Sequence, residues 1–342
     1  MFLWIVLISV AFGGSGQCWS LKNSAVDTNL RGVSVVFENS LSAESVVWAS
    51  GSHGVVLRSG DSGKSWKRLR IPDGELLDFR GVQAFDENIA YVMASGQANN
   101  SGIYKTSDAG KTWIRQYSDL REGFFLDAIA CSDETHCFAL SDPADGKFLL
   151  LATEDGQHWR ELSGDNMPAA LPNEGAFAAS NSSLVIEGKN LYFATGGPAA
   201  RVFHSADLGR TWSVAATPIY SGKPSAGIFS LAADGDVLLA VGGDYQDAKL
   251  AKNVAAVSHD AGKTWQLAEK MPGGYRSSIA KCSSGFVAVG PTGADIDHHY
   301  GEHWAPLSQD NFNALSYSKG ELWAVGPNGT IARFVDQTKI SL

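Results

Sequence analysis

The chain has 342 residues, of which 44% are hydrophobic and 18% are charged, a composition that excludes an intrinsically disordered protein. Its formal net charge is −9 and it has no Lys/Arg-rich run, so nothing in its bulk charge points to nucleic-acid binding. Its 37 glycines and 10 tryptophans indicate many tight turns and a recurring aromatic anchor, as in all-β repeat proteins.

The first 16 residues have the pattern of a secretory signal peptide. Residues 1–12 are almost wholly apolar, and the small residues at 13–16 suit a cleavage site. The apolar run is shorter than the roughly 20 residues that a membrane-spanning helix needs. We therefore expect a signal peptide at 1–16 and one secreted or periplasmic domain over 17–342, with no membrane span after cleavage. An uncleaved membrane anchor is the alternative, because no Lys or Arg stands within the first residues.

An octet with the pattern Ser/Thr-x-Asp-x-Gly-x-Thr/Ser-Trp organises the rest of the chain. Four clean copies occupy residues 59–66, 106–113, 205–212 and 258–265. They place Asp61 and Trp66, Asp108 and Trp113, Asp207 and Trp212, and Asp260 and Trp265 at equivalent positions. Degraded copies at 152–159 and 297–304 keep the tryptophan, and successive tryptophans stand 47, 46, 53, 53 and 39 residues apart. This spacing suits one four-stranded propeller blade per repeat.

Short runs rich in β-branched and aromatic residues surround each octet. In the second unit they lie at 79–85, 89–94, 103–106 and 113–116, separated by Gly, Asn and Asp. The first blade opens at residues 30–37. Four such runs per unit predict a blade of four antiparallel strands with the octet in the turn before the outer strand.

The last unit has strand-like runs at 312–317, 322–325 and 330–334 but no octet. We expect residues 19–21 to supply its outer strand, so that both termini close the ring and remove the exposed sheet edges. The predicted fold class is therefore all-β: a seven-bladed β-propeller of four-stranded antiparallel blades, closed by an N-terminal strand. Six or eight blades are the alternatives.

The octet has a structural logic. The carboxylate of Asp108 can accept hydrogen bonds from backbone N–H groups across its own turn, and Gly110 permits a positive φ. Trp113 then packs a large apolar face between neighbouring blades. We interpret the four octet aspartates as parts of the fold rather than as catalytic residues.

Cys131 and Cys137 bracket a short polar turn at 132–136, which predicts a disulfide across a hairpin in an exported protein. Zinc binding by these cysteines and His136 is the alternative. Cys18 and Cys282 are left over, and the sequence does not show whether the fold brings them together.

Three arginines, Arg31, Arg80 and Arg276, stand just before inner strands in their units, so repeat symmetry predicts that they gather on one face around the axis. Further candidates for that face are Glu174, before a strand expected at 176–180, and Asp127, Asn313, Asp244 and Tyr245. In one interpretation the arginines bind an anionic ligand or an acidic peptide. In the other, each arginine pairs with a carboxylate of the adjacent blade.

Segment 295–303 carries the residue types of a metal site, but its histidines fall on octet positions, so we interpret it as a divergent turn. No Gly-rich phosphate loop joins a strand to a helix. We expect no metal and no cofactor.

The octets match the Asp boxes of the bacterial neuraminidase repeat, so the chain resembles the sialidase-like propeller superfamily. A closer resemblance is to the photosystem II stability/assembly factor-like family, carried by 79–82 (Phe-Arg-Gly-Val), by 47–51 (Val-Trp-Ala-Ser-Gly) and by 322–326 (Leu-Trp-Ala-Val-Gly). This resemblance implies a non-enzymatic, seven-bladed binding scaffold.

We therefore expect a monomeric extracytoplasmic scaffold that holds a protein partner, or an anionic or carbohydrate ligand, on its Arg-bearing axial face. The alternative is a glycoside hydrolase or carbohydrate-binding propeller of the sialidase superfamily, in which Glu174, Asp127 or Tyr245 would carry the chemistry. The sequence favours the scaffold without deciding whether the protein is an enzyme.

Overall fold

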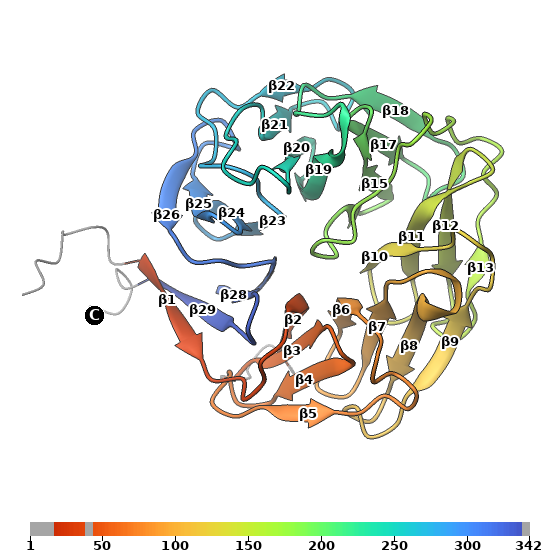
Figure 1. Cartoon of the computed structure of the whole chain (residues 1–342), viewed down its shortest axis with the longest axis vertical. Coiled ribbons are helices and arrows are strands. Elements are labelled where there is room, and N and C mark those ends of the chain that lie inside the picture. Colours follow the sequence, from red (N-terminus) through yellow and green to blue (C-terminus); the bar gives the residue numbers. More distant parts are fainter. Residues whose placement is uncertain (1–16, 38–43, 337–342) are drawn as a thin grey trace, which may run out of the picture.

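A computed structural model describes residues 17–37 and 44–336, which form a ring of seven antiparallel sheets around a central axis (Figure 1). Six sheets have four strands and one has five. The described residues contain one helix, the short 3-10 helix η1 (Ala98–Asn100). The predicted all-β, seven-bladed propeller is confirmed, and the predicted signal peptide lies outside the described residues.

The strands of the first four blades are given from the axis outward. Blade 1 has β2 (Leu30–Val36), β3 (Val46–Gly51), β4 (Val55–Ser59) and β5 (Lys67–Leu69). Blade 2 has β6 (Phe79–Ala84), β7 (Ala90–Ala94), β8 (Gly102–Thr106) and β9 (Ile114–Ser118). Blade 3 has β10 (Leu126–Cys131), β11 (Cys137–Ala144), β12 (Lys147–Thr153) and β13 (Arg160–Glu161). Blade 4 has β14 (Leu184–Glu187), β15 (Asn190–Ala194), β17 (Arg201–Ser205) and β18 (Ser213–Ala216).

The other three blades follow in the same order. Blade 5 has β19 (Lys223–Asp234), β20 (Val237–Asp244), β21 (Ala255–Ser258) and β22 (Gln266–Leu267), with β16 (Gly196–Gly197) added beside β19. Blade 6 has β23 (Ser278–Cys282), β24 (Gly285–Gly290), β25 (Gly293–Asp297) and β26 (Ala305–Ser308). Blade 7 has β27 (Ala314–Ser318), β28 (Glu321–Val325), β29 (Ile331–Asp336) and β1 (Gln17–Lys22).

The ring closes through the two ends of the described chain, as predicted. Strand β1 pairs antiparallel with β29, with Trp19 opposite Phe334. The ring of Trp19 also packs on Phe312, with centroids 4.8 Å apart. The N-terminal strand thereby covers an edge that β29 would otherwise expose.

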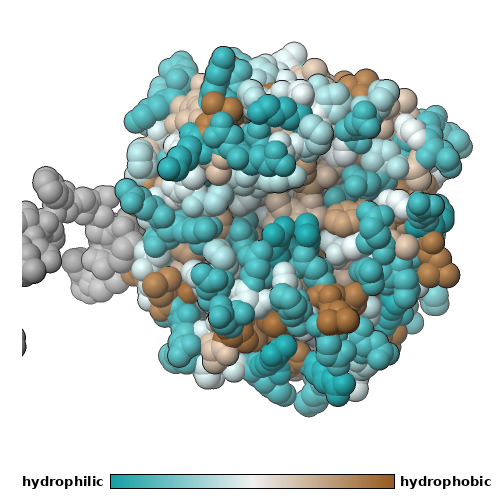
Figure 2. Space-filling model, in the orientation of Figure 1, coloured by the Kyte–Doolittle hydropathy of each residue, from teal (hydrophilic) through white to brown (hydrophobic). Residues whose placement is uncertain are grey.

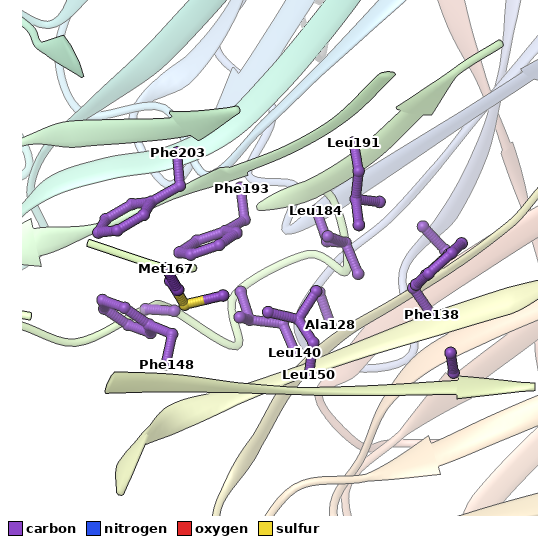
Figure 3. Packing of buried hydrophobic residues seen from close by; sticks show 13 residues of the cluster. Ala128, Phe138, Leu140, Phe148, Leu150, Met167, Leu184, Leu191, Phe193 and Phe203 are labelled. Carbon is purple, nitrogen blue, oxygen red and sulfur yellow. The ribbon is translucent and has the colours of Figure 1, made fainter. Parts of the chain in front are cut away.

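The apolar core is divided among the spaces between neighbouring blades. Figure 3 shows one such cluster, in which side chains of blades 3 and 4 meet. Phe148 of blade 3 lies 5.1 Å from Phe193 and 5.3 Å from Phe203 of blade 4, measured between ring centroids. Burying a side chain of this kind stabilises the fold by about 1.5–3 kcal/mol, so blade-to-blade packing holds the ring together.

Each clean octet forms a hydrogen-bonded turn. In the first, the Ser59 hydroxyl donates to Asp61 (2.7 Å) and accepts from the Gly63 N–H (2.8 Å). The Asp61 carboxylate accepts from the N–H and the hydroxyl of Ser65, at 2.9 and 2.6 Å. Gly63 has a φ of +76°, and a Cβ there would stand 2.5 Å from the ring of Trp323 in blade 7. The turn therefore shapes its own blade and rests against the preceding one.

The two degraded octets form related turns with other residues. In blade 3 the turn uses Thr153 and Asp155, one position later than Ala152 and Glu154: the Thr153 hydroxyl accepts from the Gly156 N–H at 3.0 Å. The octet alignment that put Ala152 and Glu154 at the polar positions was wrong, because the Gly156 N–H bonds to a hydroxyl three residues back, whereas in the clean octets the glycine bonds four residues back. In blade 6, Asp297 accepts from the N–H groups of His299, Gly301 and His303 at 2.8, 2.5 and 2.7 Å. Segment 295–303 is thus a divergent turn.

The predicted disulfide is present. Cys131 and Cys137 stand opposite each other at the end of the β10–β11 pair and are joined by a bond of 2.02 Å. The bond uses both sulfurs that the zinc alternative would have needed as thiolates. Cys282 is a buried, free cysteine.

Candidate functional site

The inner strands of four blades carry a β-bulge, close to the strand start in β2, β6 and β10 and inside the longer β19. Arg31, Arg80 and Asp127 each lie between two residues that pair with the next strand, while they themselves have no partner in the ladder. Phe229 takes the same place in β19 of blade 5. A bulge redirects the side chain of its extra residue, and all four side chains line one cavity of about 470 Å³, called here the axial cavity.

The segment that precedes the inner strand of blade 4 reaches the centre of the ring and lines this cavity. Residues 176–183 do not form the strand expected at 176–180, and the inner strand of blade 4 begins only at Leu184. The carbonyl of Ala178 accepts from Arg31 and from Arg80, each at 3.2 Å. The hydroxyl of Ser180 donates to the carbonyl of Ser277 in blade 6 at 2.6 Å. The strand prediction was wrong because this segment bonds across the ring to blades 1, 2 and 6 (Figure 1, yellow-green loop at the centre).

Of the two arginines in the axial cavity, Arg80 has a carboxylate counterion and Arg31 has none among the described residues. Arg80 pairs with Asp78, with 2.7 Å between Nε and Oδ2. Among the residues that the structure describes, Arg31 has no carboxylate at ion-pair distance, and its Nε is buried without a hydrogen-bond partner. Burial, together with the charge of Arg80, lowers the pKa of Arg31. The cavity therefore holds a cation whose charge the fold leaves largely uncompensated.

Two carboxyl groups share the cavity with the arginines. Asp127 is 1% exposed, and neither of its carboxyl oxygens has a hydrogen-bond partner. Burial, and secondarily the charge of Asp142, raise the pKa of Asp127 well above its usual range. Burial also raises the pKa of Asp142 to about 6, although the N–H of Ala176 donates to that carboxylate at 3.0 Å. Asp127 thus favours its neutral form, which leaves the arginine charges dominant.

Aromatic side chains form part of the wall of the axial cavity. Phe177 stacks on Phe229 with centroids 3.8 Å apart, and Tyr275 meets Phe229 edge-on at 4.7 Å. Tyr245 lies at the outer margin and is 51% exposed. This wall offers a flat apolar surface beside the guanidinium groups. On the face shown in Figure 2, pale and tan residues lie in the hollow near the centre, with teal, hydrophilic residues beside it.

Arg276 does not line the axial cavity. It is 2% exposed and pairs with Asp295 of the same blade, with 2.6 Å between Nε and Oδ2. A second nitrogen donates to the hydroxyl of Thr292 at 2.8 Å. The structure thus brings two of the three predicted arginines together and buries the third inside blade 6.

Glu174 and Asp244 are held by partners of their own. Glu174 accepts from Nε of Arg201 at 2.8 Å and from the hydroxyl of Thr195 at 2.6 Å. Asp244 pairs with Lys223, with 3.1 Å between Nζ and Oδ2. Both carboxylates are buried ends of ion pairs, and a role for either in ligand binding remains a prediction.

A second hollow adjoins the axial cavity over blade 4. It has a volume of about 680 Å³ and is lined by Glu174 among others. It shares the lining residues Asp142, Ala176 and Phe177 with the axial cavity, so the two hollows are neighbours.

Residues 17–37 and 44–336 hold no group of three or more His, Cys, Asp or Glu side chains placed to bind a metal ion. No helix in this part of the chain has the length and apolar character to cross a membrane.

Comparison with known proteins gives one family match. The model of the family described as "Photosynthesis system II assembly factor YCF48" matches residues 7–271, more than half of the chain. No curated protein matches the sequence significantly.

Many solved structures share the fold. One is YCF48 bound to D1 peptide, at 13% identity and a TM-score of 0.65, covering 95% of this chain and 98% of that chain. Another is YCF48 from Cyanidioschyzon merolae, at 14% identity and a TM-score of 0.66, covering 93% and 99%. Virginiamycin B lyase from Staphylococcus aureus also matches, at 12% identity and a TM-score of 0.65, covering 93% and 99%. At these identities the similarity establishes the fold.

Proposed function

Because the chain belongs to the photosynthesis system II assembly factor YCF48 family, we propose that it is a non-catalytic, extracytoplasmic scaffold that holds a segment of a client protein at its Arg-bearing axial cavity. The apolar run and small residues at 1–16 support the extracytoplasmic location. The solved structure of YCF48 bound to D1 peptide supports a protein segment as the ligand class, since it shows a propeller of this fold holding a peptide.

The proposal rests mainly on Arg31, whose charge has no counterion among the described residues. Its guanidinium is half-buried, has one neutral partner in the carbonyl of Ala178, and faces a cavity with an aromatic wall. Burying a charge without a counterion is costly, so an arginine in this position gains most from an anionic ligand. The neighbouring hollow, lined in part by residues 170–177, offers the rest of a bound segment a second surface.

The distribution of charged groups favours binding over glycoside hydrolysis. A sialidase-like site needs three arginines around one substrate carboxylate, and here Arg276 is committed to Asp295. Glu174, one of the three residues considered for such chemistry with Asp127 and Tyr245, is committed to Arg201. We therefore place the glycosidase second, and a screen of fluorogenic glycosides that detects turnover would reverse this order.

The test uses arrays of peptides from the exported and membrane proteins of the source organism. We expect a small set of peptides to bind, and Arg31→Gln to weaken their binding at least tenfold, the loss of about one charge-assisted hydrogen bond. Arg68→Gln, at an exposed arginine of the outer strand β5, is the matched control and should bind as the wild type. Equal binding by Arg31→Gln and the wild type would refute the axial cavity as the client site.

The location has a separate test. Alkaline phosphatase fused after residue 30 should be active, because that enzyme folds only where disulfides form. An inactive fusion that accumulates in the cytoplasm would refute export.

A further inference from the structure

We infer that the seam between blades 3 and 4 holds a second binding site, which takes a small organic anion with an apolar body through Leu208 and Arg210. This site lies outside the axial cavity, and the inference goes beyond the proposed function.

A cavity of about 630 Å³ opens between blades 3 and 4 and is called here the seam cavity. Blade 3 contributes residues of its β10–β11 hairpin and residues on either side of β13, and blade 4 contributes its octet turn at 208–210. None of the residues that line it also lines the axial cavity. Its volume suits a small organic molecule, since pockets for such ligands commonly measure about 300–1,000 Å³.

The outer strand of blade 3 explains why the seam is open here. Strand β13 has only two residues, so Ser163 and the residues that follow it leave the sheet and border the seam cavity. The side-chain amide of Asn166 then donates to the carbonyl of Arg210 at 3.3 Å. This bond ties the bordering segment to the octet turn of blade 4, so both blades hold the rim of the cavity.

The apolar part of the seam cavity comes mainly from Phe138 and Leu162 of blade 3 and from Leu208 of blade 4. Phe138 and Leu162 belong to the packed cluster between these two blades. Leu208 stands outside that cluster and is 40% exposed. The cavity therefore extends the apolar core of the seam toward solvent, where a ligand can cover it.

Leu208 is unusual for its place in the octet. Its φ is +56°, in the left-handed region that disfavours a bulky side chain. The equivalent residues of the other three clean octets have φ values of +55°, +62° and +58° and are small: Ser62, Ala109 and Ala261. The turn thus needs no large side chain at this position, and packing buries little of the one it has. Contact with a ligand accounts for a leucine here.

The charged groups around the seam cavity leave one cation without a counterion. Glu154 and Arg160 pair with each other, with 2.6 Å between Oε1 and Nη2. His136 faces Asp133, with 2.9 Å between Nδ1 and Oδ2. Arg210 is exposed and forms no ion pair with another described residue. A basic residue stands at this position in all four clean octets, so the repeat supplies the cation and the seam cavity supplies the apolar surface beside it.

These two parts define the ligand. The apolar surface favours an alkyl or aryl body, and a guanidinium favours a carboxylate, sulfonate or phosphate over a neutral polar group. Because the whole chain carries a net charge of −9, attraction of the anion depends on close contact with Arg210 rather than on the long-range field of the protein.

The test uses two fluorescent probes with the same ring system. Anilinonaphthalene sulfonate carries an anionic group, and phenylnaphthylamine lacks it. We expect both probes to bind with a rise in fluorescence. Leu208→Ser should weaken the binding of both about tenfold, because it removes apolar contact. Arg210→Gln should weaken the sulfonate about fivefold, the loss of one hydrogen bond to an anion, and leave the neutral probe unchanged.

Two controls locate the probes. Folding does not limit Leu208→Ser, because serine already occupies the equivalent position at Ser62. Tyr300→Ser is the matched control: Tyr300 holds the same octet position in blade 6 and is 58% exposed, but it does not line the seam cavity. It should bind both probes as the wild type does. Titrations in the Arg31→Gln background separate the seam cavity from sulfonate bound at the axial cavity.

Competition with laurate and with phenylpropionate then distinguishes an alkyl carboxylate from an aryl one, and displacement of the sulfonate probe by either supports the inference. Unchanged affinities in Leu208→Ser, an equal loss in Tyr300→Ser, an equal effect of Arg210→Gln on both probes, or displacement by neither carboxylate would overturn it. Client peptides that depend on Arg31 should bind Leu208→Ser as they bind the wild type, so failure of this inference leaves the proposed function standing.

Discussion

Arg31 and Arg276 should respond differently to the same substitution, because Arg276 takes the place of Leu30 in its blade: the N–H of each donates to a carbonyl of the preceding blade. Arg276→Met removes the guanidinium that pairs with Asp295 and donates to Thr292. Asp295 is 2% exposed and would keep only a long contact of 3.2 Å with the N–H of Gly273. Breaking one side of a buried pair costs about 3–5 kcal/mol, because the remaining charge stays buried without compensation. We expect a loss of this size in the free energy of unfolding.

Arg31→Met is the matched control. Arg31 has no carboxylate partner among the described residues, so the substitution removes a desolvated charge and one hydrogen bond to Ala178. Methionine keeps most of the aliphatic volume, and we expect the free energy of unfolding to change by less than about 1 kcal/mol. For ligand affinity we expect the opposite order: Arg31→Met should bind ligand more weakly than the wild type, and Arg276→Met should bind like the wild type at temperatures where it is folded.

The assay is urea unfolding followed by tryptophan fluorescence at pH 7, with circular dichroism as a second probe of the same transition. A loss of less than about 1 kcal/mol in Arg276→Met would refute the reasoning, because the lower limit expected for a broken buried pair is about 3 kcal/mol. Equal destabilisation by Arg31→Met would also refute it, because it would mean that the unpaired arginine is as much a part of the fold as the paired one.

Three other outcomes are expected. Since burial raises the pKa of Asp142 from 3.8 to about 6, its ionised form costs stability that is absent below pH 4 and grows as the pH rises through 6. Asp142→Asn should match the wild type in urea at pH 4 and exceed it by up to about 3 kcal/mol at pH 8; equal midpoints at both pH values would contradict this. A chain that begins at residue 23 lacks β1 and exposes the edge of β29, so light scattering should detect oligomers, and a monodisperse monomer would count against ring closure by β1. Reducing the bond between Cys131 and Cys137 should cost about 2–3 kcal/mol, seen as a lower urea midpoint with dithiothreitol and absent in a variant with both cysteines replaced by serine.

Features that depend on neighbouring residues in the chain were readable from the sequence. The octet turns arise from hydrogen bonds within a few residues, such as those between Ser59, Asp61 and Ser65, so the pattern itself implies the structure. The spacing of the tryptophans predicted one blade per repeat. The Trp-led strand at 19–21, which had no partner in its own unit, predicted that the N-terminal strand closes the ring. The disulfide was predictable because its cysteines face each other across one short hairpin.

Tertiary structure alone decided what each charged side chain contacts. Arg31 and Arg276 look equivalent in the sequence repeat, yet the fold offsets them by one residue, because the N–H of Arg276 makes the inter-blade bond that Leu30 makes in blade 1. Arg276 therefore pairs with Asp295 inside blade 6, while Arg31 stands at the bulge and has no described carboxylate at ion-pair distance. Asp142 lies far in sequence from both arginines of the cavity, Arg31 and Arg80, and no local pattern marks it. It acquires its buried surroundings only where segment 170–183 reaches the centre of the ring and bonds with other blades. Hydrogen bonds within a turn are fixed by the local sequence, whereas the compensation of a buried charge depends on side chains that the fold brings from distant parts of the chain.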